Sequence, residues 1–419
     1  MSASPAEPLP LAGLRVLDLS RLLPGPFATR VLADLGADVV KVETPDGGDY
    51  LRWMPPLAPP AGSTGGARSS WAFRALHADK RGVAIDLKHP EGAAALRDLV
   101  AASDVLLESF RPGVLARLGF GRDVLDALNP RLVHCAITGY GQQGPMSRAP
   151  GHDLNFLARS GALALGGPPE AGPAIPPVQL ADLSAALWAV IGILSALEAR
   201  RHTGRGRFID VDMTAGVSAL LMTTLAPWLN GAPAPRPRGA DALTGGLTCY
   251  RTYVCRDGGV FALAALEPQF WAAFCARVER PAWLSRQLDP KLGAEVAALF
   301  LSRDAADWTA LLAGTDACAE PALTLEAWRD DPQTAASRVL FEGADGMIHV
   351  RTPVRDPEAQ APRPAPDLGE HTREVLAALG WDTGRIDALI AASIPTPSAR
   401  TASGISSGRH PASTLESCP

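Results

Sequence analysis

Three acid/base residues occur at the edges of apolar runs, far apart along the 419-residue chain. His152 lies in the tripeptide GHD, Asp182 in LADL and Glu267 in ALEPQF. Burying a charged group without a partner is costly, so such residues inside a fold need a chemical reason. An imidazole and carboxylates can exchange protons with a substrate, and the set therefore predicts proton-transfer chemistry.

Each of these residues also has a plain structural interpretation. A single histidine after glycine is more often a turn or core residue than a catalytic one. Asp182 precedes a long apolar helix and can act as an N-cap, which stabilises a helix by about 1 kcal/mol. Glu267 before a proline can simply complement a helix dipole. The pattern alone leaves these alternatives open.

The first third of the chain alternates short apolar strands with helices. Residues 14–19 and 39–42 are predicted strands around a helix at 27–35, which PGP opens and Gly36 ends. The alternation continues with strands at 82–87, 105–107 and 132–137 and helices at 90–102, 114–118 and 124–128. Such units imply parallel strands with right-handed crossovers, and so a doubly wound, Rossmann-like α/β domain.

Composition changes after a predicted helix at 181–200 and a strand at 207–212. A Pro/Gly-rich linker at 230–239 leads to predicted strands at 250–254 and 260–264 and helices at 268–278 and 305–313. This order predicts a smaller α+β domain. The expected domains are a large one at 9–229, the small one at 240–342, a return segment at 343–394 and a disordered tail at 395–419, rich in Ser, Thr, Pro and Gly.

Several ordered motifs resemble the class III CoA-transferases (CaiB/BaiF type), and within them most closely the α-methylacyl-CoA racemases. The resemblance runs from about residue 9 to residue 394. It rests on LAGLRVLD at 11–18, GADVVKVE at 36–43, ESFRPG at 108–113, GYGQQG at 139–144, GHD at 151–153 and HTGRG at 202–206. One such motif is weak, whereas the ordered set is specific.

The resemblance implies a cofactor-independent racemase or epimerase acting on a 2-methylacyl-CoA thioester. His152 and Asp182 are then expected on opposite faces of the α-carbon, one removing a proton and the other returning one through a planar enolate. Glu267 is expected to hydrogen-bond His152 and fix its tautomer. Asp153 is expected to anchor the same turn or orient the thioester. In the family, the return segment rejoins the large domain and two chains interlock as a homodimer.

The resemblance also suggests which residues bind CoA. Its phosphates need arginine or lysine, and Arg111 and Lys80 are the expected contacts. Leu22, Leu23 and Pro24 are expected to line the nucleotide side of the pocket. The sequence departs from the family pattern at Thr44, where an arginine is expected, which predicts weaker or redistributed CoA binding.

Two other functions fit parts of the same sequence. In a CoA transferase, Asp182 would be the nucleophile and would form an anhydride and then an aspartyl-CoA thioester. His152 and Glu267 favour racemisation, because covalent transfer does not require a histidine on the opposite face. A noncatalytic acyl-CoA-binding protein would keep the basic residues and tolerate loss of all three acid/base groups, so their joint presence disfavours it.

Composition excludes several other classes. A net charge of −5 and a pI near 5.9 argue against a nucleic-acid partner. No dinucleotide glycine fingerprint or paired-histidine metal motif occurs. The six cysteines lack CxxC spacing, and no leader or unbroken apolar stretch of spanning length is present. These features predict a cytoplasmic enzyme without metal or membrane attachment, with CoA entering only as part of the substrate.

Overall fold

The structure is a computed structural model that describes residues 8–59 and 69–393. It divides into two compact units. The first takes in the described residues up to Phe156, Gln179–Gly216 and those from Ser337 onward, and the second takes in Leu157–Val178 and Val217–Ala336. Residues 157–178 and 217–229 thus fall in the second unit, whereas the sequence predicted one continuous large domain over 9–229. The predicted tail at 395–419 lies outside the described residues.

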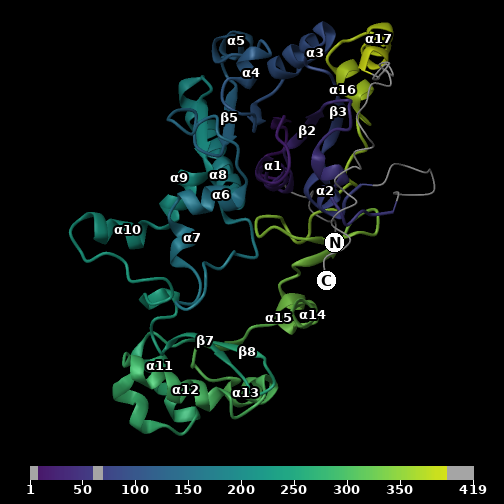
Figure 1. The fold of residues 1–419 in the computed structure, drawn as a ribbon. Helices are drawn as coiled ribbons and strands as arrows, with labels where there is room; N and C mark the ends of the chain where they lie inside the picture. Colours follow the sequence, from purple (N-terminus) through teal and green to yellow (C-terminus); the bar gives the residue numbers. More distant parts are fainter. Residues whose placement is uncertain (1–7, 60–68, 394–419) are drawn as a thin grey trace, which may run out of the picture. The chain divides into compact units, whose positions relative to one another are not determined.

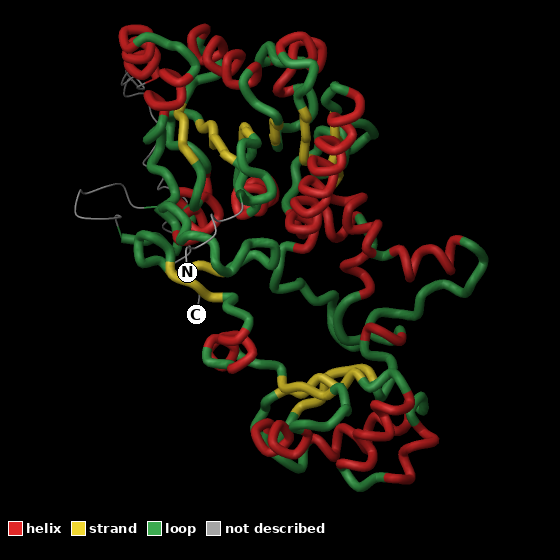
Figure 2. The backbone as a smooth tube through the Cα atoms, turned by 180° about the vertical axis from the view of Figure 1, so that it is seen from behind, coloured by secondary structure: helices red, strands yellow, loops and turns green. Residues whose placement is uncertain are grey.

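The first unit is built on a six-stranded sheet, whose strands are yellow in Figure 2. Neighbouring strands all pair in parallel, in the order β3-β2-β1-β4-β5-β6. The strands are β1 Arg15–Asp18, β2 Asp38–Glu43, β3 Arg81–Ala84, β4 Val105–Glu108, β5 Val133–Thr138 and β6 Phe208–Asp212. The predicted parallel α/β arrangement is confirmed. The chain reverses its direction of travel across the sheet between β1 and β4, and ligands of such folds bind outside the carboxyl ends of strands at this point.

Helices cover both faces of this sheet. Figure 1 shows α3, α4, α5, α16 and α17 on one side of the strands and α1 and α8 on the other. The helical elements of this unit are α1 Pro24–Asp34, η1 Tyr50–Trp53, α2 Trp71–His77, α3 Pro90–Ala101, α4 Val114–Arg117, α5 Arg122–Leu128, α6 Asp153–Arg159, α8 Leu180–Thr203, α9 Met213–Leu220, α16 Thr372–Ala378 and α17 Thr383–Ser393, with α6 and α9 crossing into the second unit.

Local sequence explains why α1 forms where it does. Pro24 and Pro26 occupy its first turn, where a missing N–H costs nothing. Gly36 follows its end with φ +100°, a conformation that glycine adopts without strain. The chain can therefore turn sharply back into β2.

The return segment is anchored on the β3 edge of the sheet. The backbone N–H of His371 donates to the Gly82 carbonyl at 2.8 Å, and Arg355 Nη1 lies 2.8 Å from buried Asp34 Oδ1 at the end of α1. Val375 and Leu376 of α16 pack into the same core cluster as strand β3 and helix α3. A short hairpin of β10 Leu340–Glu342 and β11 Ile348–Val350 precedes this anchor.

Among the described helices, α8 is long and apolar enough to cross a membrane by length and composition. It packs against α1, β5 and β6, and 39% of its most apolar segment is buried. A helix in the core of an α/β fold can have the same length and apolar composition as a membrane-spanning helix, so these properties of α8 do not indicate a membrane span. Leu187, Trp188 and Ile191 on it are exposed in the single chain.

The second unit combines a small antiparallel sheet with helices, as the sequence predicted for this region. Strands β7 and β8 coincide with the predicted 250–254 and 260–264, and β9 adds a third strand that no pattern indicated. Its core is aromatic and includes Trp271, Phe274 and Phe300. The elements are α7 Ala162–Leu165, α10 Met222–Leu229, η2 Ala242–Thr244, β7 Tyr250–Val254, β8 Val260–Ala264, α11 Pro268–Arg277, η3 Pro281–Arg286, η4 Pro290–Leu292, α12 Gly293–Phe300, α13 Ala305–Leu312, β9 Ala319–Pro321, α14 Leu325–Arg329 and α15 Pro332–Ala336.

Candidate active site

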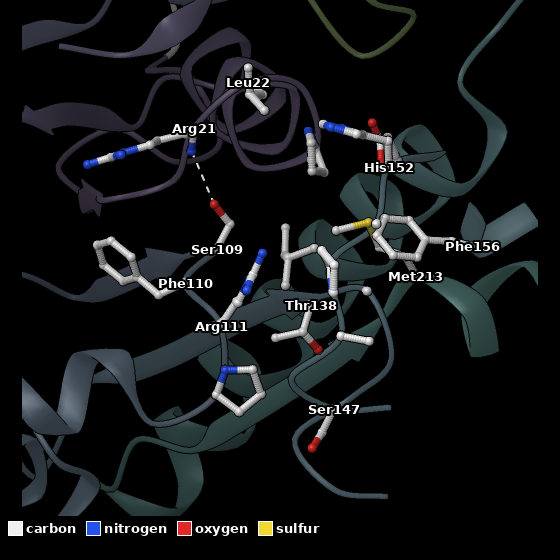
Figure 3. A pocket seen from close by; sticks show the side chains of 18 of the residues that line it. Arg21, Leu22, Ser109, Phe110, Arg111, Thr138, Ser147, His152, Phe156 and Met213 are labelled. Atoms are coloured by element: carbon white, nitrogen blue, oxygen red, sulfur yellow. Dashed lines mark hydrogen bonds between the residues drawn. The ribbon is translucent and has the colours of Figure 1, made fainter. Parts of the chain in front are cut away.

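A cavity of about 490 Å³ opens in the first unit beyond the carboxyl ends of β1, β4 and β5. His152 and Asp182 both line it, so the fold brings these two residues to one cavity. We call it the reaction cavity. Its lining consists of Leu19, Arg21, Leu22, Pro24, Tyr50, Ser109, Phe110, Arg111, Pro112, Ile137, Thr138, Gly139, Ser147, Ala149, Pro150, Gly151, His152, Phe156, Asp182 and Met213 (Figure 3).

His152 is held in the turn that precedes α6. Its backbone N–H donates to Asn155 Oδ1 at 3.0 Å, and its carbonyl accepts from the Asn155 N–H at 2.8 Å. A Cβ at Gly151 would come within 2.5 Å of the Phe156 ring, so the glycine lets this ring pack under the turn. The imidazole itself is exposed in the single chain. The expectation that it would be buried is therefore wrong for the chain alone.

Asp182 lies in the first turn of α8 and is half-buried. Burial raises the pKa of its carboxyl group to about 7, and the neighbouring Asp153 carboxylate adds to the increase. Asp182 is therefore protonated over most of the acidic range and titrates near neutral pH. A carboxyl group poised in this way can return a proton to a substrate near neutral pH.

Asp153 does not line the cavity but anchors the helix that carries Asp182. Its Oδ1 accepts from the backbone N–H of Ala181 at 2.7 Å and of Asp182 at 3.1 Å. A carboxylate here satisfies two N–H groups at the start of α8 and complements the positive end of the helix. The predicted roles of Asp153, anchoring the His152 turn or orienting the thioester, stay predictions, and the hydrogen bonds found connect that turn to the start of α8.

Arg111 is the expected phosphate contact that does line the reaction cavity. In Figure 3 its side chain extends into the middle of the lining, whereas the Arg21 side chain points away from His152. Leu22 and Pro24 also line the cavity, as expected. Leu23, the residue before α1, is not among the lining residues.

Lys80 was predicted to contact a CoA phosphate, but its side chain lies inside the fold. Its side chain is fully buried, and its Nζ donates to Thr29 Oγ1 at 2.7 Å and to the Pro26 carbonyl at 3.0 Å. The ammonium group also lies 3.4 Å from Asp18 Oδ2. Because its donors are used inside the fold, Lys80 ties α1 to β1 and lines neither of the cavities described here. The sequence could not distinguish this buried cation from a surface one.

Glu267 belongs to the second unit, where it precedes α11 and is exposed. No hydrogen bond from its side chain caps that helix. The expectation that it is buried is wrong for the single chain, and its role as the partner of His152 stays a prediction.

A second cavity, of about 610 Å³, opens at the carboxyl ends of β1, β2 and β3. Leu19, Arg21 and Phe110 line both cavities. Arg21 and Lys88 are the basic residues of this second lining, and no ion pair is found for either side chain among the described residues. The lining consists of Leu19, Arg21, Val42, Glu43, Thr44, Pro45, Asp46, Ile85, Asp86, Leu87, Lys88, Phe110, Val114, Leu118 and Ala392.

Known proteins share this fold and much of the sequence. Residues 11–372 match the profile of CoA-transferase family III. The chain belongs to this family. Human alpha-methylacyl-CoA racemase is 36% identical over 392 residues, covering 90% of this chain and 95% of that protein. The succinate–glutarate CoA-transferase of Agrobacterium fabrum (strain C58) is 35% identical, covering 90% and 98%. A CaiB/BaiF family structure from Brucella suis has a TM-score of 0.77 at 31% identity, covering 89% of this chain and 100% of that one.

The chain is therefore an enzyme of CoA-transferase family III, and its relatives of similar identity include both racemases and transferases. Thr44, where the family resemblance led us to expect arginine, lines the second cavity. Arg21 and Lys88 are basic residues of the second cavity that sequence reasoning did not name, and for Arg21 a signal was available. The signal was its position just beyond strand β1, where ligands of doubly wound folds bind.

No cluster of potential metal ligands occurs among residues 8–59 and 69–393. The five described cysteines, at positions 135, 249, 255, 275 and 318, are all free. Burial raises the pKa of the Cys135 thiol, which keeps this residue in its unreactive, protonated form. Cys418 lies outside the described residues.

Proposed function

We propose that this protein is a racemase or epimerase that inverts the α-carbon of 2-methylacyl-CoA thioesters. The observation that carries the proposal is that His152 and Asp182 line one cavity, with the pKa of Asp182 raised to about 7. Inversion needs a base on one face of the carbon and an acid on the other. A neutral imidazole can remove the α-proton, and a protonated Asp182 can return one to the resulting enolate. In the reverse direction, ionised Asp182 is the base.

CoA transfer between carboxylic acids is the second candidate, because transferases of similar identity are among the relatives. That chemistry requires ionised Asp182 to attack a thioester carbonyl. A carboxyl group with a pKa of about 7 is partly ionised at neutral pH and suits either reaction. The histidine favours inversion over transfer, because His152 lines the same cavity and covalent transfer does not require a histidine on the opposite face.

The two adjoining cavities fit the two ends of an acyl-CoA. The thioester would occupy the reaction cavity, and the adenine nucleotide would lie in the second cavity, where Arg21 and Lys88 can meet phosphate oxygens. Arg111 would bind the part of CoA that enters the reaction cavity. Glu43 adds little negative charge to this surface, because Arg52 Nη2 pairs with its Oε2 at 2.7 Å.

Hydrogen exchange at the α-carbon tests the proposal directly. One diastereomer of a 2-methylacyl-CoA, incubated in heavy water with the enzyme, should gain α-deuterium and convert to the other. Asp182→Asn and His152→Asn should each lower inversion by at least about 100-fold, the contribution of one positioned acid or base. Asp126→Asn and His202→Asn change exposed residues of the same types outside both cavities and should leave the rate unchanged.

The alternative has its own signature. If no acyl-CoA gains deuterium while hydroxylamine converts Asp182 to its hydroxamate only in the presence of an acyl-CoA, with CoA or the carboxylate released, the enzyme is a transferase. Wild-type rates in the Asp182→Asn variant would eliminate both assignments.

A homodimer, interlocked as in the family, is part of the same proposal. Leu187 and Ile191, one turn apart on α8, are exposed by 51% and 53% in the single chain. Large apolar side chains on one helix face are typical of surfaces that a partner covers. Because interlocked chains cannot separate without partial unfolding, Ile191→Glu should lower the fraction of dimer formed when the chains refold, measured by light scattering, whereas Glu198→Gln, on the same helix, should not. A wild-type monomer would contradict the proposal.

A further inference from the structure

The turn between β1 and α1 separates the two cavities. Leu19 and Arg21 line both of them, and Leu22 and Pro24 line the reaction cavity. A small change in this turn would therefore move walls of both cavities together. We call residues 19–24 the partition turn.

The partition turn contains an unfavourable backbone conformation. Leu22 has φ +63°, in the left-handed region that branched side chains rarely adopt. Its N–H points at the carboxylate of Asp49, and each carboxylate oxygen lies 3.1 Å from the nitrogen. A charged acceptor makes a stronger hydrogen bond than a neutral one, so Asp49 can hold Leu22 in this conformation.

The Asp49 side chain is itself held in place by burial, by Lys41 and by a backbone N–H group. It is 1% exposed, its Oδ2 lies 3.5 Å from Lys41 Nζ, and its Oδ1 accepts from the Leu51 N–H at 3.0 Å. The fully buried Lys41 ammonium also donates to the carbonyl of Ser20 in the partition turn. Asp49 and Lys41 line neither cavity. Their hydrogen bonds with the turn are made to its backbone, at the Leu22 N–H and the Ser20 carbonyl, while Asp49 also caps η1, whose Tyr50 lines the reaction cavity.

We propose that Asp49 is a positioning residue that holds the partition turn and thereby keeps the nucleotide and the thioester of one acyl-CoA in register. This inference rests on the proposed function. Binding energy from the nucleotide, which does not react, can raise the rate by orienting the thioester, and a fixed wall between the cavities would transmit that orientation. Asp49 provides that rigidity through Leu22, without touching the substrate.

The test compares two substrates in the variant Asp49→Asn. Asparagine keeps one acceptor but removes the charge and the second oxygen. For an acyl-CoA, kcat should fall by about 10-fold or more, because a small misplacement at the reacting atoms is costly. For the matching acyl-pantetheine thioester, which lacks the nucleotide, kcat should change by less than about 3-fold. Equal losses for both substrates would overturn the proposal.

Asp34→Asn is the matched control for lost stability. Asp34 is a buried carboxylate at the far end of α1, and it pairs with Arg30 at 2.9 Å and Arg355 at 2.8 Å. Its replacement should lower thermal stability while leaving the ratio of the two kcat values unchanged. A change in that ratio equal to the change in Asp49→Asn would mean that any destabilisation produces the effect.

Two measurements keep the inference testable whatever the chemistry proves to be. Amide hydrogen exchange in residues 20–23 should be faster in Asp49→Asn than in Asp34→Asn, even if no acyl-CoA is inverted. In a Leu22→Gly background, Asp49→Asn should accelerate exchange less, because glycine adopts the left-handed conformation freely. Unchanged exchange in the single variant would refute the role of Asp49, whereas an inactive wild type with this exchange pattern would refute only the proposed function.

Discussion

Replacing Asp182 by asparagine should stabilise the protein at alkaline pH while it abolishes inversion. In the fold, the pKa of Asp182 is raised to about 7 from the ordinary value of 3.8, mainly by burial. Between these two values the unfolded chain has released the proton and the folded chain still holds it. Stability therefore falls as pH rises through this window, and the loss is complete above about pH 7.

The size of the effect follows from the shift. A difference of about 3 pKa units corresponds to about 4 kcal/mol at full ionisation, which is an upper limit because solvent reaches part of the side chain. Asparagine has the same shape but does not titrate. Relative to the wild type, Asp182→Asn should gain up to about 3 kcal/mol in free energy of unfolding between pH 5 and pH 8.

Urea unfolding at pH 5 and pH 8, followed by circular dichroism, measures this gain. Asp126→Asn, which changes an exposed carboxylate, provides the control and should track the wild type at both pH values. The reasoning fails if Asp182→Asn is no more stable than the wild type at pH 8, or if its advantage is equally large at pH 5. Such a result would mean that the carboxyl group ionises at no cost in the folded chain.

Three further outcomes are expected. Asp153→Asn keeps an oxygen acceptor at the start of α8 but removes the negative charge beside Asp182. The pKa of Asp182 should therefore fall, and the activity that needs protonated Asp182 should be lost at a pH lower by roughly one unit. An unchanged pH–rate profile would show that the charge has no influence. Glu267→Gln should lower the rate of inversion by about 10-fold, the usual effect of removing a partner that orients a functional histidine, and a wild-type rate would remove Glu267 from the site. Arg21→Gln should raise KM for an acyl-CoA by about 10-fold, and a similar increase for the acyl-pantetheine thioester would argue against nucleotide binding by Arg21.

Local patterns determined most of the first unit. Short apolar runs bounded by proline and glycine predicted β1, α1 and β2 to within a few residues, because these signals act on the backbone within one or two turns. The same patterns gave no sign of α2 or of strand β9, which span only seven and three residues and are too short to show a period. Their formation depends on contacts with neighbouring elements.

The sequence alone identified the residues of the acid/base pair. The resemblance of its motifs to a known family then suggested their roles. Tertiary structure decided that His152 and Asp182 line one cavity, that Asp153 anchors α8 rather than lining it, and that Lys80 is buried. It also showed that Asp49 supports the turn between the two cavities. The physical reason is that sequence fixes which groups a chain carries, whereas pKa values, hydrogen-bond partners and burial depend on neighbours that only folding brings together.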